Sequence, residues 1–219
     1  APWRVASPEV MWKRLRWAMV AGLALGALTV VIGVTSVPVV LTITLAGFII
    51  SAIVVRYGTV VSARPEGFRA FGKVVRNDPG YWGGQIAHIG VALMAISLAT
   101  TNGLAVRDEV SIPVGGSVIV DSYCIEYVDA FGYADPNREV TGVRVNVKDE
   151  GCDSLKATLE PRLVTYAGTS QPIATPDVWT GLVDDVYISI RGGSASEVLL
   201  NVFVYPFQWL LWVGGMVVV

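Results

Sequence analysis

His88 has the clearest capacity for chemistry, and it is the single histidine among the 219 residues. It lies inside an uncharged run that extends from Pro79 to Val106. If the hydrocarbon begins near Trp82, six residues at ~1.5 Å each place the imidazole ~9 Å below the membrane surface. A polar ring at that depth is costly unless it faces a bundle interior, so we expect His88 to have a function.

Three roles fit a histidine in this position. A neutral imidazole can ligate a haem iron, relay protons, or form a structural hydrogen bond between helices. Small neighbours leave room for a flat macrocycle, but they equally favour close packing of helices in membranes. The residue pattern therefore leaves all three roles open. At helical spacing, the neighbours of His88 are Gly84, Gln85, Val91, Ala92 and Ala95.

The two cysteines, Cys124 and Cys152, are separated by 28 residues and form no CxxC motif. In an oxidising compartment they can form a disulfide that joins neighbouring strands. Alternatively, they are two buried reduced thiols, which pack like small apolar side chains. Neither interpretation makes them catalytic.

The composition is that of a membrane protein. Hydrophobic residues make up 53% of the chain and charged residues 16%, whereas a soluble domain carries about 25% charge. Lys and Arg number 16 and Asp and Glu 18. This near balance indicates no basic surface for nucleic acid.

Long uncharged segments predict the membrane spans. The run from Trp17 to Val55 is long enough for two helices of ~20 residues, with a break near Pro38. We expect a small antiparallel all-β domain, a barrel or sandwich, to be inserted among α-helical spans. The predicted order is a cytoplasmic basic segment (1–16), a transmembrane hairpin (17–58), a cytoplasmic loop (59–81), a span carrying His88 (82–103), an extracytoplasmic β-domain (104–204) and the start of a last span (205–219).

The charges predict the orientation of these spans. Residues 1–81 carry nine basic and three acidic side chains, a net +6, whereas residues 82–219 carry a net −8. Basic residues in short loops are retained in the cytoplasm, so the acidic part should lie outside. Loop 59–81 is also suited to binding anionic membrane lipid. The basic residues near the first three spans are Arg4, Lys13, Arg14, Arg16, Arg56, Arg64, Arg69, Lys73 and Arg76.

Residues 104–204 have the pattern of antiparallel strands. Short stretches rich in Val, Ile and Tyr alternate with period two and are separated by Gly, Pro, Asn and Asp. We expect seven or eight strands, a number typical of a small barrel or sandwich. The stretches are SVIVD, YCIEYVDAF, VTGVRVNVK, SLKATLEP, RLVTYA, DVYISIRG and VLLNVFVYP.

The order of four landmarks resembles the CcmF-type subunit of the bacterial cytochrome c haem lyase. The first two are YWGGQIAHIGVALMAISLA and the following RDEVSIPVGGSVIVDSYCIEYVDAF. The third is LEPRLVTYAGTSQPIATPDVWTGLVDDVYISI, and the fourth is the aromatic entry VFVYPFQWLLWVGGMVV. The resemblance covers nearly the whole chain, which we interpret as the carboxy-terminal portion of a longer protein.

The resemblance implies a function in cytochrome c maturation, in which haem is substrate and is attached covalently to the CxxCH motif of apocytochrome c. His88 would be one axial ligand of a membrane haem b, with the second ligand supplied by an earlier span. The implied partners are apocytochrome c, a haem-delivery chaperone and thiol-reducing subunits, in the bacterial inner membrane with a periplasmic β-domain. Only His88 is carried over from the family, and no residue is assigned to thioether formation. The alternative function is a non-catalytic assembly scaffold whose β-domain binds partner proteins.

Overall fold

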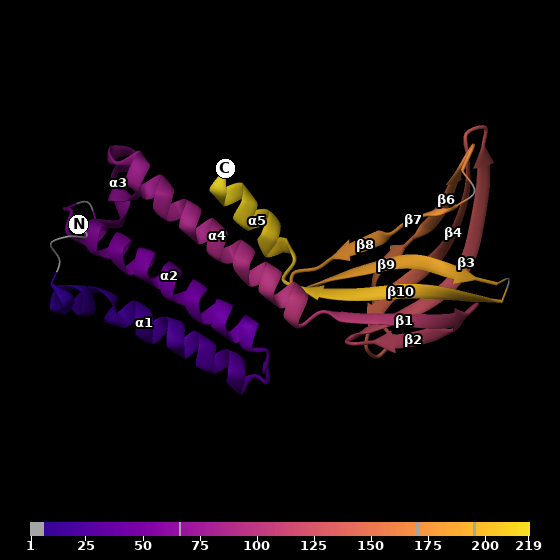
Figure 1. Ribbon diagram of the computed structural model, residues 1–219, viewed down its shortest axis with the longest axis horizontal. Helices are drawn as coiled ribbons and strands as arrows, with labels where there is room; N and C mark the ends of the chain where they lie inside the picture. Colours follow the sequence, from indigo (N-terminus) through magenta and orange to yellow (C-terminus); the bar gives the residue numbers. More distant parts are fainter. Residues whose placement is uncertain (1–6, 66, 170, 195) are drawn as a thin grey trace. The chain divides into compact units, whose positions relative to one another are not determined.

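The computed structural model describes residues 7–65, 67–169, 171–194 and 196–219; Arg4 lies outside them. The chain forms two compact units (Figure 1). One unit is helical and comprises Ala1–Gly103 with Gln208–Val219, and the other is the strand-rich segment Leu104–Phe207. The predicted fold class, membrane helices with an inserted antiparallel β-domain, is confirmed.

Apolar helices dominate the first unit. Among the described residues, three helices are long and apolar enough to cross a membrane, which makes the chain a membrane protein. A 3₁₀ turn, η1 (Gly67–Ala70), and a short helix, α3 (Phe71–Asn77), connect the second and third of them. The three long helices are α1 (Pro8–Val31), α2 (Val37–Ser62) and α4 (Pro79–Gly103), and a ten-residue apolar helix, α5 (Trp209–Val218), follows the β-domain.

Helical structure extends into both basic segments. Because α1 begins at Pro8, residues Lys13, Arg14 and Arg16 lie on its first turns. Pro is well accommodated in the first turn of a helix, and Lys, Arg, Leu and Met all favour helical backbone. Most of the segment 59–81 is likewise helical.

Glycines allow α1 and α2 to pack closely. A Cβ atom at Gly22 would lie 2.7 Å from the carbonyl oxygen of Thr44 on α2. One at Gly47 would lie 2.6 Å from a methyl group of Leu25 on α1. Small residues at such crossings permit the close backbone approach that stabilises helix pairs in membranes.

The β-domain consists of two antiparallel sheets. The first has the strand order β1-β10-β9-β8, and the second has the order β2-β3-β4-β6-β7, with β5 also paired to β4. In the described residues the strands are β1 (Val106–Pro113), β2 (Ser117–Val120), β3 (Tyr123–Asp135), β4 (Arg138–Asp149), β5 (Leu155–Leu159), β6 (Arg162–Tyr166), β7 (Ile173–Thr175), β8 (Asp177–Thr180), β9 (Asp184–Gly193) and β10 (Glu197–Pro206).

One hydrophobic core lies between the two sheets. Along β10, buried Val198, Leu200, Val202 and Val204 alternate with less buried residues, as a strand with one face in a core requires. Their partners across the core include Ile125, Tyr127, Val145 and Val147 from the second sheet. Burial of these aliphatic side chains stabilises the domain by about 25 cal/mol per Å² of apolar surface.

The structure adds β1, β7 and β8 to the strands that the sequence pattern predicted. In β1 three consecutive charged residues, Arg107, Asp108 and Glu109, interrupt the alternation. Pro172 and Pro176 flank β7. All three are edge strands, where proline and charge are tolerated because one side of the backbone needs no ladder partner.

Candidate functional site

The start of α4 positions His88. Asp78 precedes Pro79, and its Oδ1 accepts a hydrogen bond from the backbone N–H of Tyr81 at 3.2 Å. An aspartate cap followed by proline is a favourable helix start, because the carboxylate satisfies an otherwise unpaired N–H. His88 follows about two and a half turns after Pro79.

Aromatic packing holds this end of α4 against α2 and α3. Trp82 is buried and stacks edge-on against Tyr57 of α2, with ring centroids 5.2 Å apart. Val61 of α2 and Val74 of α3 belong to the same cluster. This packing restricts rotation of α4 about its axis and therefore determines which face carries His88.

A hydrogen bond determines the protonation pattern of the His88 ring. Its Nδ1 lies 2.6 Å from the carbonyl oxygen of Gly84, one turn earlier on the helix. A carbonyl oxygen only accepts, so Nδ1 carries the proton and donates. The lone pair of Nε2 is then available, which is the usual arrangement for a histidine that ligates a metal.

His88 lies on an exposed stripe of α4. Val91, Leu98 and Asn102 are also exposed on this stripe, and the small residues Gly84 and Ala95 are half-buried between them. Of the other neighbours named from the sequence, Gln85 is half-buried and Ala92 is buried. The histidine is therefore presented outward from the helix and is not buried by the described part of the chain.

Helix α5 lies beside α4 in Figure 1, and it contacts the side of α4 that carries Gly90. A Cβ atom at Gly90 would lie 2.6 Å from the carbonyl oxygen of Gly214, and one at Gly214 would lie 2.6 Å from the carbonyl oxygen of Gly90. Further along, the Ser97 hydroxyl donates to the carbonyl of Gln208 at 3.4 Å. The two helices are thus antiparallel and in close contact.

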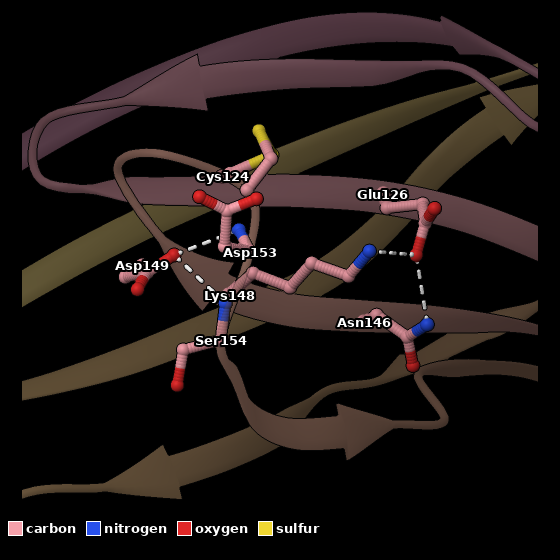
Figure 2. The surroundings of a disulfide bond; sticks show 8 residues. Cys124, Glu126, Asn146, Lys148, Asp149, Asp153 and Ser154 are labelled. Carbon is pink, nitrogen blue, oxygen red and sulfur yellow. Dashed lines mark hydrogen bonds and ion pairs between the residues drawn. A yellow bond between two sulfur atoms is a disulfide. The ribbon is translucent and has the colours of Figure 1, made fainter.

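The two cysteines form a disulfide, which resolves the two alternatives left open by their spacing. Cys124 on β3 and Cys152 in the β4–β5 turn are joined with Cα atoms 5.3 Å apart (Figure 2). Closing a loop of 28 residues in this way stabilises the folded state by about 3.6 kcal/mol. The bond ties β3 to the β4–β5 turn, and Cys124 is fully buried.

Polar side chains next to the disulfide bridge β3 and β4. Glu126 accepts a hydrogen bond from Asn146 at 2.8 Å and pairs with Lys148 at 3.0 Å (Figure 2). Hydrogen bonds from Asn146 and then Lys148 lower the pKa of the Glu126 carboxyl. These contacts form a cross-strand ladder on the solvent face, the kind of pairing that stabilises adjacent strands.

The last residue of β4, Asp149, has an acidic side chain with a structural function. Oδ1 of Asp149 accepts hydrogen bonds from the backbone N–H groups of Asp153 and Ser154, each at 3.0 Å (Figure 2). The bond from Ser154 in particular lowers the pKa of Asp149. Asp149 therefore shapes the turn.

An acidic pair at the start of β9, half-buried Asp184 and buried Asp185, was missed by the sequence reasoning. Asp184 accepts a hydrogen bond from the Tyr123 hydroxyl at 3.1 Å. Asp185 is buried, and its Oδ1 has no hydrogen-bond partner among the described residues. Burial raises the pKa of both carboxyls. The only available sequence signal was two adjacent acids before an apolar strand, which is equally typical of an exposed turn.

The comparisons with curated sequences and with solved structures give the same result. No protein-family model matches the chain. The cytochrome c-type biogenesis protein CcmF of Pseudomonas aeruginosa is 26% identical over 176 residues, covering 78% of this chain and 26% of the relative. CcmF proteins of Haemophilus influenzae and Escherichia coli K12 are each 24% identical over 137 residues, covering 62% of this chain and 21% of each relative.

A solved structure described as cytochrome c heme lyase CcmF has the same fold. Its TM-score is 0.73 at 19% identity, and the match covers 99% of this chain and 35% of that one. The chain is similar to CcmF in sequence and in fold. The predicted resemblance to CcmF is therefore confirmed, and the chain spans about a quarter of the length of the curated relatives it matches.

The CcmF-like fold separates the candidate residues between its two units. His88 belongs to the helical unit, whereas both cysteines and the acidic pair belong to the β-domain. Within the described ranges, no three His, Cys, Asp or Glu side chains gather as a metal-ion site. The single histidine of the chain lies on α4.

Proposed function

We propose that this chain is part of a cytochrome c haem lyase, in which it holds a membrane haem b through His88. It would thereby assist covalent attachment of haem, the substrate, to the CxxCH motif of apocytochrome c. The names of the CcmF relatives support a role in cytochrome c maturation. The observation that carries the proposal is the His88 geometry, with Nδ1 bound to Gly84 and Nε2 available.

The residues around His88 fit a haem. The ring is on the exposed stripe of α4, so Nε2 can approach an iron without displacing a packed side chain. Gly84 and Ala95 have small side chains, which leave space for the edge of a porphyrin. The Gly84 carbonyl would orient the imidazole and increase its basicity as a ligand. A haem bound there would supply an iron that exchanges single electrons at a potential tuned by its axial ligands.

In a bis-histidine site the second axial ligand would come from outside this chain, because His88 is its only histidine. The exposed stripe that contains His88, Val91 and Leu98 is suited to pack against another membrane helix carrying that ligand. A ring held between two helices would also be shielded from lipid, which reduces the cost of a polar group in the hydrocarbon.

The orientation and partners belong to the same proposal. The basic segments would lie in the cytoplasm and the acidic β-domain in the periplasm of a bacterial inner membrane, following the positive-inside tendency. The β-domain would contact apocytochrome c, and a haem-delivery chaperone and thiol-reducing subunits would act with it. The net negative charge of the β-domain would attract basic segments of apocytochrome c within a Debye length of ~8 Å.

The test is an optical spectrum of the protein purified from its membrane, both oxidised and dithionite-reduced. We expect His88→Ala to lose the reduced b-type α band while protein yield is preserved. Asn102→Ala is the matched control, since Asn102 is a polar residue on the same exposed stripe, and it should retain the band. An unchanged spectrum in His88→Ala would refute the ligand assignment.

The absence of haem from both wild type and Asn102→Ala would instead favour a scaffold. The hydrogen bond from Nδ1 to Gly84 is the observation consistent with that alternative, because it satisfies one ring nitrogen without a cofactor. In a scaffold, His88→Ala would leave partner assembly unchanged, whereas disruption of the β-domain would abolish it.

A further inference from the structure

The β8–β9 turn has an apolar tip that the proposed function does not use. Leu182 is 86% exposed and Val183 is 56% exposed, although both are large hydrophobic residues. The turn is tight, because the Gly181 N–H donates to the Asp184 carbonyl at 3.0 Å. A Cβ atom at Gly181 would lie 2.7 Å from that carbonyl, so the turn requires glycine and keeps its two apolar side chains at the tip.

This tip is bonded to the residue where the chain leaves the β-domain. The backbone N–H of Phe207 donates to the Val183 carbonyl at 2.7 Å. Phe207 is the last residue of the β-domain unit, and Gln208 is the first of the returning helical segment. Phe207 has φ 56°, a left-handed conformation uncommon for an aromatic residue, and its side chain is 37% exposed.

The length of α4 and its hydrogen bond to Gln208 give the depth of Gln208 in the membrane. With 25 residues at ~1.5 Å each, α4 is ~38 Å long, so a centred helix extends ~4 Å beyond each side of a ~30 Å hydrocarbon core. Ser97, which bonds the Gln208 carbonyl, lies six residues or ~9 Å before the end of α4. Gln208 is therefore ~5 Å inside the hydrocarbon boundary on this side.

We propose that Leu182 and Val183 insert into the interfacial layer of the lipid bilayer and anchor the β-domain on the membrane surface. Val183 is bonded to Phe207, which directly precedes Gln208, so the chain itself ties the tip to the segment that enters the membrane. The tip residues 181–183 carry no charge. Exposed Leu and Val are unfavourable in water but gain from transfer into the acyl boundary.

Lipid is the occupant that these observations favour. The neighbouring segment already enters the membrane at this depth, and Trp209 and Trp212 follow within a few residues, as is common for residues near a bilayer interface. The acidic side chains after the tip do not oppose insertion. Asp185 is buried in the domain, and Asp184 is bonded to Tyr123.

Site-directed fluorescence quenching tests this anchor. Both cysteines of the chain are in the disulfide, so Leu182→Cys introduces a free thiol for a polarity-sensitive fluorophore. The labelled protein is reconstituted in phosphatidylcholine vesicles with a minority of phosphatidylglycerol. We expect a blue-shifted emission, strong quenching by lipids that carry a nitroxide at a shallow acyl position, and several-fold weaker quenching by aqueous iodide than in the control.

The matched control is Asn137→Cys, in the exposed β3–β4 turn of the same unit. Tyr123, near the apolar tip through its bond to Asp184, lies at the other end of β3, ~40 Å from this turn at ~3.3 Å per residue. The label on Asn137→Cys should be quenched by iodide and not by the lipid nitroxide. Val183→Cys provides a second probe of the tip, and retention of the disulfide verifies folding of each variant.

Two outcomes would overturn the proposal. If the Leu182→Cys label is quenched by iodide as strongly as the control and is insensitive to the lipid nitroxide, the tip is in water. If the label is protected from both quenchers, the tip is covered by protein and the occupant is not lipid. The readout does not depend on haem, so failure here leaves the proposed role of His88 untouched.

Discussion

Individual hydrogen bonds determine the properties of the polar residues in this chain. The bond from Nδ1 of His88 to Gly84 directs Nε2 outward. In the β-domain, Tyr123 is largely buried and donates its hydroxyl proton to Asp184. Burial, and then the charge of Asp184, raises the pKa of Tyr123 from 10.0 to about 12. The phenol therefore makes the β-domain sensitive to alkaline pH.

We predict an alkaline loss of stability that depends on Tyr123. Its pKa is higher in the folded state than in the unfolded state, so its contribution is complete below pH ~10 and declines as pH rises toward ~12. Tyr123→Phe should lower the free energy of unfolding at pH 7 by about 1 to 2 kcal/mol, because a hydrogen bond to a carboxyl is lost. Between pH 9 and pH 11, the free energy of unfolding should also fall less in Tyr123→Phe than in wild type.

Urea unfolding followed by tryptophan fluorescence measures this effect, since Trp179 packs edge-on against Tyr123 at 5.6 Å between ring centroids. Tyr133→Phe is the control, because Tyr133 is 43% exposed. The prediction is wrong if wild type and Tyr123→Phe lose the same stability between pH 9 and pH 11.

At the scale of elements, glycines set the distances between helices. The α4–α5 crossing occurs where Gly90 and Gly214 meet, and the α1–α2 crossing uses Gly22 and Gly47. Lipid tails are as apolar as leucine, so helix association in a membrane depends on close van der Waals contact. A methyl group added at a crossing pushes the two backbones apart. A single glycine-to-alanine substitution can therefore weaken the association of the two helices.

We predict that Gly214→Ala destabilises the α4–α5 pair by about 1 to 3 kcal/mol through overpacking. The added Cβ would lie 2.6 Å from the carbonyl oxygen of Gly90 and 2.7 Å from a side-chain carbon of Met94. Gly215→Ala is the control, because a Cβ atom there meets nothing within 4 Å. Both substitutions improve helix propensity by a similar amount, so their difference isolates the contact.

Thermal unfolding in detergent micelles, followed by circular dichroism, compares the two variants. Gly214→Ala should have the lower midpoint, and Gly215→Ala should equal or exceed wild type. Equal midpoints for the two alanine variants would show that the crossing does not require glycine.

At the scale of the whole molecule, charge is distributed unevenly along the chain. The net +6 of residues 1–81 surrounds the first spans, and the net −8 of residues 82–219 is concentrated in the β-domain. Positive residues near span ends are retained on the cytoplasmic side, whereas acidic residues have little influence on orientation. The proposed periplasmic position of the β-domain follows from this asymmetry.

We predict opposite labelling of two engineered thiols in intact cells. Asn137→Cys in the β-domain should react with a membrane-impermeant maleimide, because it would be exposed in the periplasm. Ala63→Cys, exposed at the end of α2, should react only after the membrane is permeabilised. The reverse pattern would invert the proposed orientation. The native cysteines are joined in the disulfide and add no free thiol.

Local patterns predicted most of the fold. Hydropathy over Trp17 to Val55 and over Pro79 to Val106 indicated the helical spans, and alternation with period two indicated the antiparallel β-domain. Such patterns record which face of a segment meets an apolar environment. They failed at β1, β7 and β8, where charge or proline at a sheet edge interrupts the alternation.

By itself, the sequence determined the membrane class, the β-domain, the resemblance to CcmF and the candidacy of His88, because each depends on composition or on neighbours along the chain. Only the tertiary structure decided that Cys124 and Cys152 are bonded, that Asp185 is buried, and that His88 lies opposite the Gly90 contact with Gly214. These features arise from contacts between residues far apart in the chain. Residue types alone do not specify such contacts, because the same side chains are compatible with several packings.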